Sequence, residues 1–391
     1  MKNKLFNSAK IPLIKKYTKG VKMKRSFIRE ILENTTNETI SFAGGLPDEK
    51  LFPHIQLKES AIKVMNDPIS LQYSTSTGLD SLKEKIAKFY NDANFPTTKE
   101  NIIITSGSQQ ALDIISRYNC NKNITIEAPS YLGAMNIFNL NNMIQNSVDL
   151  HSDGCDTFMF NTSFKKSKLA YLIPDFQNPT GYTYSKEKRK NIASIVKQYD
   201  GILIEDAPYS QIYFEEEYES ISKSIPNNSY HLGSFSKTLA PALRIGWIRA
   251  SKELLEPLIA YKEAMDLHTN GLAQYILNDY LQNEENFIEH KKVLRKIYKK
   301  KMQIFSSSLD EILPKFKYTK PKGGMFIYGK FENIDSLELI NKCMKKGVVF
   351  VPGAEFYNNI TSNNEIRFNF THCSASEIHK GLNIIKEIIG D

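Results

Sequence analysis

The chain has 391 residues, of which 41% are hydrophobic and 24% charged, an ordinary composition for a globular protein of about two domains. No apolar run approaches the roughly 18–20 residues that span a bilayer, which disfavours a membrane protein. No apolar segment follows the N-terminal lysines, which disfavours a secretory signal. The cysteines Cys120, Cys155, Cys343 and Cys373 are far apart and form no CxxC pair, so we expect no zinc site, no disulfides and a cytoplasmic location.

The formal charge of +8 comes from one end of the chain. Residues 1–29 carry ten lysines and arginines and no acid, whereas the rest of the chain carries 41 basic and 43 acidic residues. We therefore expect no nucleic-acid or membrane partner for the body of the protein. The N-terminal arm has three interpretations: a solvated segment, a tail for nucleic acid or an anionic membrane, or an arm beside a site for anionic substrates.

From about residue 70 to residue 250, short apolar runs alternate with helical patterns. Apolar residues three to four positions apart predict a helix over 79–89, and a similar pattern predicts one over 192–199 that ends at Gly201. Unbroken apolar runs are typical of strands buried on both faces of a sheet. We expect six such strands, at 101–105, 123–129, 169–176, 201–207, 230–235 and 244–250.

This alternation predicts an α/β domain with a mostly parallel central sheet and helices on both faces. A charged helical stretch at 285–312 then precedes strand-like runs at 321–329, 347–353 and 365–370, which predict a smaller α+β domain. We place the large domain at residues 50–290, the small one at 291–391, and an N-terminal arm that packs with the small domain at 1–49.

Five of the predicted strands end in polar segments: SGSQQ, APSY, PDFQNPTG, EDAPY and GSFSK. Each segment alone can be an ordinary turn, because Gly, Pro, Asn and Ser are common in turns. Ligands of open α/β sheets bind beyond the carboxyl ends of the strands, so five such endings in a row indicate one binding site.

The first of these endings predicts an anion site. Gly107 and Ser108 precede a periodic apolar pattern, and the N–H groups and dipole at a helix N-terminus bind anions. Ser234, Ser236 and Arg244 can add hydroxyls and a forked cation to the same anion. Neither GxxxxGK[ST] nor GxGxxG occurs, so this is not a Walker loop or a dinucleotide loop.

A lysine beside a phosphate site, here Lys237, can form a Schiff base with an aldehyde cofactor, and pyridoxal 5′-phosphate carries both groups. Its ring nitrogen needs a nearby carboxylate to stay protonated, which Asp206 can supply. Tyr209 and Asn178 can hydrogen-bond the phenolic oxygen of the ring, and Tyr131 can stack on its face. The alternative interpretations are a helix or turn cap for Asp206 and a core residue for Tyr131.

Together with SFAGGLPDEKLFP, LQYSTSTG, PKGGMF, FVPGAEF and IRFNF, these segments resemble the class I/II aminotransferases of pyridoxal-phosphate fold type I, from about residue 25 to the end. The resemblance is strongest to the 2-aminoadipate aminotransferase-like subgroup, which is similar to the aminotransferase half of the MocR-type regulators. It implies a seven-stranded-type central sheet, pyridoxal 5′-phosphate as cofactor, amino acid and 2-oxo acid substrates, and a homodimer with shared active sites.

The resemblance also implies roles residue by residue. The family's catalytic residues correspond to Lys237, Asp206 and Tyr209, and its further contacts of the cofactor ring to Asn178 and Tyr131. Its phosphate ligands correspond to Ser108, Gln109, Ser234, Ser236 and Arg244, and a tyrosine that reaches the neighbouring subunit's phosphate corresponds to Tyr73. Its substrate contacts correspond to Arg367, Gly45, Asn178 and Arg29. One departure is visible, because the family often reads EDDxY where this chain reads EDAPY. Asp206 is kept, whereas Ala207 replaces an acid and Pro208 stiffens the turn.

Two arginines bear on the substrate. Taken alone, Arg367 can equally be an exposed strand residue or a residue that binds the substrate carboxylate. The resemblance implies the second role, in which Arg367 clamps the α-carboxylate. Arg29 alone is a solvated helix residue. In the subgroup, a matching arginine meets a distal carboxylate or swings away, which implies use of glutamate, 2-aminoadipate and larger apolar or aromatic amino acids.

The predicted reaction is a ping-pong transamination with 2-oxoglutarate as amino acceptor. One alternative is another reaction of the same fold type, such as β-elimination or decarboxylation, because the cofactor residues are shared. A second is a non-enzymatic, effector-sensing module like the MocR half, which needs a winged helix upstream. The roughly 30 residues before the matching motifs are too few for one, which favours an enzyme.

Overall fold

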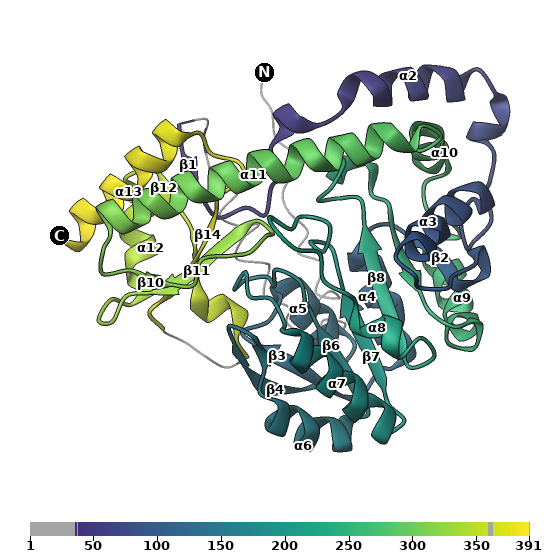
Figure 1. Cartoon of the computed structure of the whole chain (residues 1–391), viewed down its shortest axis with the longest axis horizontal. Coiled ribbons are helices and arrows are strands. Elements are labelled where there is room, and N and C mark those ends of the chain that lie inside the picture. Colours follow the sequence, from purple (N-terminus) through teal and green to yellow (C-terminus); the bar gives the residue numbers. More distant parts are fainter. Residues whose placement is uncertain (1–35, 37, 359–362, 391) are drawn as a thin grey trace, which may run out of the picture.

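The computed structural model describes residues 36, 38–358 and 363–390; Arg29 and the rest of residues 1–35 lie outside this part of the chain. The large sheet has eight strands, and Figure 1 shows it on the right of the molecule. Its spatial order is β2 (Ile102–Thr105), β9 (Gly246–Arg249), β8 (Ser229–Ser234), β7 (Ile202–Asp206), β6 (Leu169–Leu172), β3 (Asn123–Ala128), β4 (Ile144–His151) and β5 (Gly154–Cys155).

The strand directions bring the predicted polar endings to one edge of the sheet. The neighbours β8, β7, β6, β3 and β4 are mutually parallel, while β9 is antiparallel to both β8 and β2. Consequently β2 runs in the same direction as β8. All six predicted strands are present, which confirms the mostly parallel α/β sheet. Strand β4 was not predicted because its residues are mostly polar, and the two-residue β5 extends the sheet beyond seven strands.

Helices cover both faces of this sheet, as predicted. Alternate strand residues face opposite sides: Ile204 and Tyr171 pack with α4, α5 and α9, whereas Leu203 and Ala170 pack with α6, α7 and α8. The helices of this part are α2 (His54–Met65), α3 (Asp80–Asp92), α4 (Ser108–Tyr118), α5 (Leu132–Leu140), α6 (Thr157–Ser167), α7 (Lys186–Gln198), α8 (Ile221–Ser224), α9 (Lys252–Asp266) and α10 (Gly271–Tyr280).

The end of α7 corrects one prediction. The helix ends at Gln198, and the residue with left-handed backbone is Asp200, with φ of 46°, rather than Gly201. Gly201 is needed for a different reason. A Cβ there would lie 2.5 Å from the ring of Phe164 and 2.8 Å from the carbonyl oxygen of Lys168.

A second, antiparallel sheet lies on the left of Figure 1. Its order is β10 (Lys317–Tyr318), β11 (Phe326–Lys330), β14 (Glu365–Asn369) and β13 (Val351–Pro352), and a separate parallel pair joins β1 (Ile40–Ser41) to β12 (Val348–Val349). The helices here are α11 (Glu284–Ile312), α12 (Ser336–Lys345) and α13 (Ala375–Ile389). In Figure 1, α11 runs across the upper half of the molecule, below α2, towards α10. The domain boundaries at residues 50 and 290 stay a prediction.

Short 3₁₀ segments connect these elements: η2 (Glu49–Leu51), η3 (Pro68–Leu71), η4 (Lys99–Asn101), η5 (Pro241–Leu243) and η6 (Gly353–Phe356). Within the described residues, no helix combines the length and the apolar character needed to cross a bilayer.

Candidate active site

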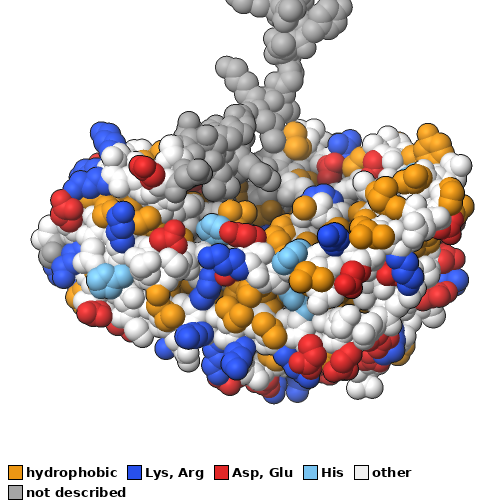
Figure 2. Space-filling view, turned by 90° about the horizontal axis from the view of Figure 1, so that it is seen from above, with side chains coloured by type: hydrophobic (Ala, Val, Ile, Leu, Met, Phe, Trp, Pro, Cys, Tyr) orange, Lys and Arg blue, Asp and Glu red, His pale blue; other side chains and the backbone are white. Residues whose placement is uncertain are grey.

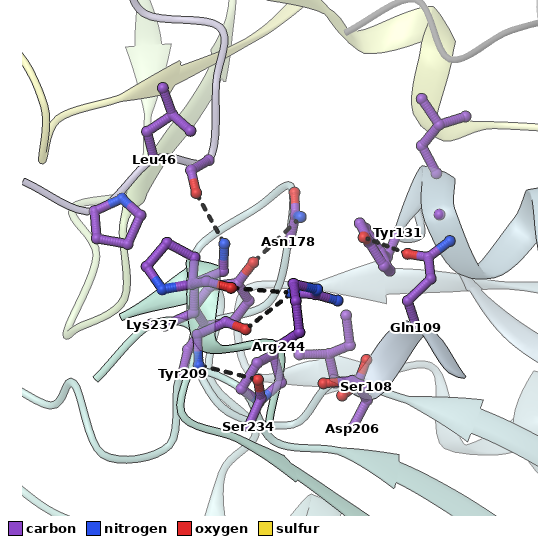
Figure 3. A pocket seen from close by; sticks show the side chains of 18 of the residues that line it. Leu46, Ser108, Gln109, Tyr131, Asn178, Asp206, Tyr209, Ser234, Lys237 and Arg244 are labelled. Atoms are coloured by element: carbon purple, nitrogen blue, oxygen red, sulfur yellow. Dashed lines mark hydrogen bonds between the residues drawn. The ribbon is translucent and has the colours of Figure 1, made fainter. Parts of the chain in front are cut away.

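A cavity of about 750 Å³ lies at the carboxyl ends of β2, β3, β6, β7 and β8. Figure 3 shows Lys237, Arg244, Ser234, Ser108 and Asp206 converging on this space. The segment 45–47 and Arg367 of β14 complete the wall. Of the predicted site residues, those that line the cavity are Gly45, Ser108, Gln109, Tyr131, Asn178, Asp206, Tyr209, Ser234, Ser236, Lys237, Arg244 and Arg367.

Lys237 lies three residues beyond the end of β8, with its amine in the cavity. Its Nζ donates a hydrogen bond of 2.9 Å to the carbonyl oxygen of Gly45. A Cβ at Gly45 would lie 3.3 Å from the ring of Phe326 and 4.0 Å from Nζ. Glycine therefore leaves room for the Phe326 ring, and its carbonyl group orients the lysine amine.

Asp206 ends β7 and is buried with only one oxygen paired. Oδ2 accepts a 2.9 Å hydrogen bond from the Tyr171 hydroxyl, whereas the buried Oδ1 has no partner among the described residues. Burial raises the pKa of Asp206 to about 7, and the hydrogen bond from Tyr171 opposes this rise. An N–H donor on a ligand, especially a charged one, would satisfy Oδ1 and stabilise the carboxylate.

Tyr171 was missed by the sequence analysis. It lies on β6, and its register partner on β7 is Ile204, two residues before Asp206. No motif contains it. The available signal was its place in an apolar strand, because a tyrosine buried there needs a partner for its hydroxyl.

The turn between β2 and α4 forms an anion site beside Arg244. Ser108 is the first residue of α4, and Gly107 before it has φ of 76°. A Cβ at Gly107 would lie 2.6 Å from Nη2 of Arg244, so glycine leaves room for the guanidinium. Nη2 donates to the carbonyl oxygen of Ser106 at 2.9 Å, and Nη1 lies 3.4 Å from Oγ of Ser236. Helix N–H groups, hydroxyls and a guanidinium together suit a phosphate.

Arg367 crosses from the second sheet to the loop after β6. The residue is 1% exposed, so it is not the exposed strand residue that its position alone allowed. Nη1 donates to Oδ1 of Asn178 at 2.8 Å, and Nη2 donates to the carbonyl oxygen of Ala43. Burial lowers the pKa of Arg367 to about 10, which still leaves it charged at neutral pH. Nδ2 of Asn178 in turn lies 3.4 Å from the Tyr209 hydroxyl.

Tyr131 and Gln109 form the opposite wall in Figure 3. The Tyr131 hydroxyl donates to Oε1 of Gln109 at 3.4 Å. A Cβ at Gly133 would lie 2.5 Å from the Tyr131 ring, so glycine allows the ring to lie against the start of α5. Tyr131 thus presents an aromatic surface to the cavity, although it also borders the hydrophobic core.

Tyr73 does not line this cavity. Its side chain is 79% exposed beyond η3, and its ring meets His268 edge-on with 5.8 Å between the ring centres. Arg29 lies outside the described residues, so its predicted role stays a prediction.

The family "Aminotransferase class I and II" matches residues 40–385. The aromatic-amino-acid aminotransferase 1 of Thermococcus litoralis is 34% identical over 389 residues, covering 95% of this chain and 93% of that protein. The 2-aminoadipate transaminase of Thermus thermophilus is 33% identical over 375 residues, covering 92% and 93%. The crystal structure of α-aminoadipate aminotransferase LysN from Thermus thermophilus, complexed with N-(5′-phosphopyridoxyl)-L-leucine, superposes with a TM-score of 0.86 at 31% identity, covering 93% and 94%.

The raised pKa of Asp206 predicts a pH dependence of stability. Between its ordinary value of 3.8 and about 7, the folded protein holds a proton that the unfolded chain releases, so this group stabilises the fold less as pH rises. In protein freed of small molecules, the free energy of unfolding of Asp206→Asn should therefore fall less steeply from pH 4 to pH 7 than that of the wild type. Urea titrations across this range measure both slopes. Asp149→Asn, at an exposed carboxyl, is the control, and equal slopes for Asp206→Asn and wild type would contradict the assignment.

Proposed function

This chain belongs to the class I and II aminotransferases, and we propose that it transfers the amino group of an L-amino acid to 2-oxoglutarate in a ping-pong reaction. It is a transaminase that depends on pyridoxal 5′-phosphate. The proposed donors are 2-aminoadipate, glutamate and large apolar or aromatic amino acids, because relatives named for 2-aminoadipate and for aromatic amino acids are 33% and 34% identical to it. One observation carries the proposal: one cavity holds a lysine amine, an anion site and a buried carboxyl oxygen that has no partner among the described residues.

The cavity fits the cofactor at both ends. Oδ1 of Asp206, which lacks a partner within the described part of the chain, matches the protonated ring nitrogen. The space that a Cβ at Gly107 would fill admits Arg244 beside the helix N-terminus, where the phosphate would bind. The other proposed contacts are Ser108, Gln109, Ser234 and Ser236 for the phosphate, Tyr209 and Asn178 for the phenolic oxygen, Tyr131 for the ring face and Lys237 for the aldehyde.

In this reaction the bound cofactor supplies an electron sink for the charge that develops on the substrate α-carbon. With the cofactor bound, Nζ of Lys237 would take up and return the proton of the substrate α-carbon, a role worth about 10²–10⁴-fold in rate. Asp206 keeps the proton on the ring nitrogen. Arg367 orients the α-carboxylate with charge-assisted hydrogen bonds, and the carbonyl group of Gly45 directs Nζ into the cavity.

We also propose a homodimer in which Tyr73 contacts the phosphate of the neighbouring subunit. The support is an exposed apolar surface that runs from α2 through η3 towards Tyr73. Figure 2 shows hydrophobic side chains gathered on the right of that view, the side on which α2 lies in Figure 1. Contiguous apolar surface of this kind marks an interaction site. The exposed residues are Ile55, Ile62, Met65, Ile69 and Leu71.

We propose a cytoplasmic location. All four cysteines are free, and three of them, Cys155, Cys343 and Cys373, are buried. Free, buried thiols suit a reducing compartment, because oxidation would not be needed for the fold.

Replacing Lys237 with alanine should abolish transamination, by at least about 10²-fold in kcat, because the residue carries the proton. Purified protein is given a panel of amino donors and 2-oxoglutarate, and glutamate is measured. The control is Lys122→Ala, which replaces an exposed lysine and should leave the activity unaffected.

Borohydride reduction followed by peptide mapping should find the cofactor attached at Lys237. Attachment at another lysine would refute the assignment. Consumption of the donor without a need for 2-oxoglutarate would instead indicate β-elimination or decarboxylation.

Replacing Arg29 with alanine should lower the ratio of kcat/KM for 2-aminoadipate to that for phenylalanine. The expected fall is about 10- to 100-fold, which corresponds to one charged hydrogen bond of about 1.5–3 kcal/mol. Arg25→Ala, four residues earlier on the chain, is the matched control. An unchanged ratio for Arg29→Ala would rule out a contact with the distal carboxylate.

Shared active sites predict complementation between two impaired proteins. Lys237→Ala subunits lack the amine but still supply Tyr73, whereas Tyr73→Ala subunits keep the amine, so each mixed dimer has one intact site. At cofactor concentrations that leave Tyr73→Ala mostly unloaded, the mixture should regain about a quarter of wild-type activity after random pairing. A mixture with only the average activity of its components would show that the sites are not shared.

A further inference from the structure

Glu127 is a fully buried carboxyl that does not line the cavity. It lies near the carboxyl end of β3, and all three of its partners come from the segment 173–184 that follows β6. The Tyr184 hydroxyl donates to Oε1 at 2.8 Å, and Nε2 of Gln177 donates to Oε2 at 3.1 Å. The main-chain N–H of Ile173 lies 3.3 Å from both oxygens.

Gln177 is also fully buried, and every polar atom of its side chain is paired. Besides its bond to Glu127, Nε2 donates to the carbonyl oxygen of Pro129 at 2.9 Å. Oε1 accepts from the N–H and the hydroxyl of Thr180, at 2.9 and 2.8 Å. Glu127 and Gln177 thus tie the loop after β3 to the loop after β6.

Both tied loops carry groups of the active site. Tyr131 follows Pro129 by two residues, and Asn178 follows Gln177 directly. Asn178 is the residue that meets both Arg367, through Oδ1, and the Tyr209 hydroxyl, through Nδ2. A shift of the Gln177 side chain would therefore move an amide that contacts both the proposed carboxylate clamp and a proposed ring contact.

We propose that Glu127 and Gln177 are positioning residues of this enzyme, which fix Asn178 and Tyr131 relative to each other before the substrate binds. The proposal rests on the proposed roles of those two residues. Its physical basis is that a buried polar network with every member satisfied is rigid, whereas loss of one partner leaves buried donors unpaired and the loops free to rearrange.

The test compares three holoenzyme variants with the wild type. Glu127→Met removes both carboxylate oxygens, the acceptors of the network, and keeps a side chain of similar volume. Glu127→Gln keeps one amide oxygen as acceptor for Nε2 of Gln177, and the Tyr184 hydroxyl rotates to accept a hydrogen bond from the new amide N–H. Glu205→Met is the matched control, because Glu205 is equally buried and accepts from the N–H groups of Ile221 and Ser222, at 3.0 and 2.7 Å, outside the cavity. The readouts are the melting temperature, kcat, KM, and the pH midpoint at which the visible absorption of the bound cofactor changes.

Glu127→Met should raise the pH midpoint by about one unit, because misplaced donors no longer stabilise negative charge on the phenolic oxygen. It should also lower kcat about 10- to 100-fold, as expected for a displacement of about 1 Å. Glu127→Gln should restore most of both values. Glu205→Met should lower the melting temperature and leave the midpoint unchanged.

A Glu127→Met protein with a wild-type midpoint and kcat would overturn the proposal, as would a Glu127→Gln protein as impaired as Glu127→Met. If Glu127→Met does not fold, Gln177→Met breaks the same contact from the loop side and should give the same shift; a wild-type midpoint there would equally overturn it. A wild-type protein that shows no cofactor absorption would refute the proposed function itself, which is a separate outcome.

Discussion

The candidate active site is built around a carboxyl group that is buried with a hydrogen bond to one of its two oxygens. Oδ2 of Asp206 accepts a hydrogen bond from the Tyr171 hydroxyl, and Oδ1 has no partner in the described part of the chain. An unpaired buried acceptor costs about 1–3 kcal/mol, and more when it is charged. A ligand with a protonated ring nitrogen removes this cost, because its N–H group pairs the oxygen and its positive charge stabilises the buried carboxylate. The proposed contact of Asp206 with the cofactor would therefore relieve a local instability of the fold.

Charge in the cavity is arranged around that single acid. Among the described lining residues, three cations, Lys237, Arg244 and Arg367, accompany one carboxyl group, Asp206. Each of the three cations donates to a main-chain carbonyl oxygen. Cations are thus in excess over carboxyl groups among these described lining residues, which suits anionic ligands. A phosphate and an α-carboxylate, held at opposite ends of a cofactor–substrate pair, use that excess.

Most of the site was predictable because one rule, the common edge of parallel strands, brings together residues that are distant in sequence. That rule correctly gathered the residues around Ser108, Asn178, Asp206 and Lys237 into one cavity. It could not identify Tyr171, whose role depends on which strand lies beside β7 and in which register. The same limit applies to Glu127 and its partners, because interactions between loops leave no local pattern. The chain reversal at Asp200 was also missed, since an aspartate can adopt a backbone that usually marks glycine.

Arg367 connects the two sheets, and its contacts constrain how a substrate can bind. One nitrogen holds Asn178, a second holds the carbonyl oxygen of Ala43, and the buried Nε has no partner among the described residues. A carboxylate that binds through two parallel N–H groups must use Nε or share a nitrogen that is already engaged. A carboxylate that uses the second N–H of Nη1 shares that nitrogen with Asn178, whose amide also faces Tyr209. The proposed carboxylate clamp and the proposed contact of the cofactor ring therefore meet at one amide, and we propose that the buried pair Glu127–Gln177 sets its position.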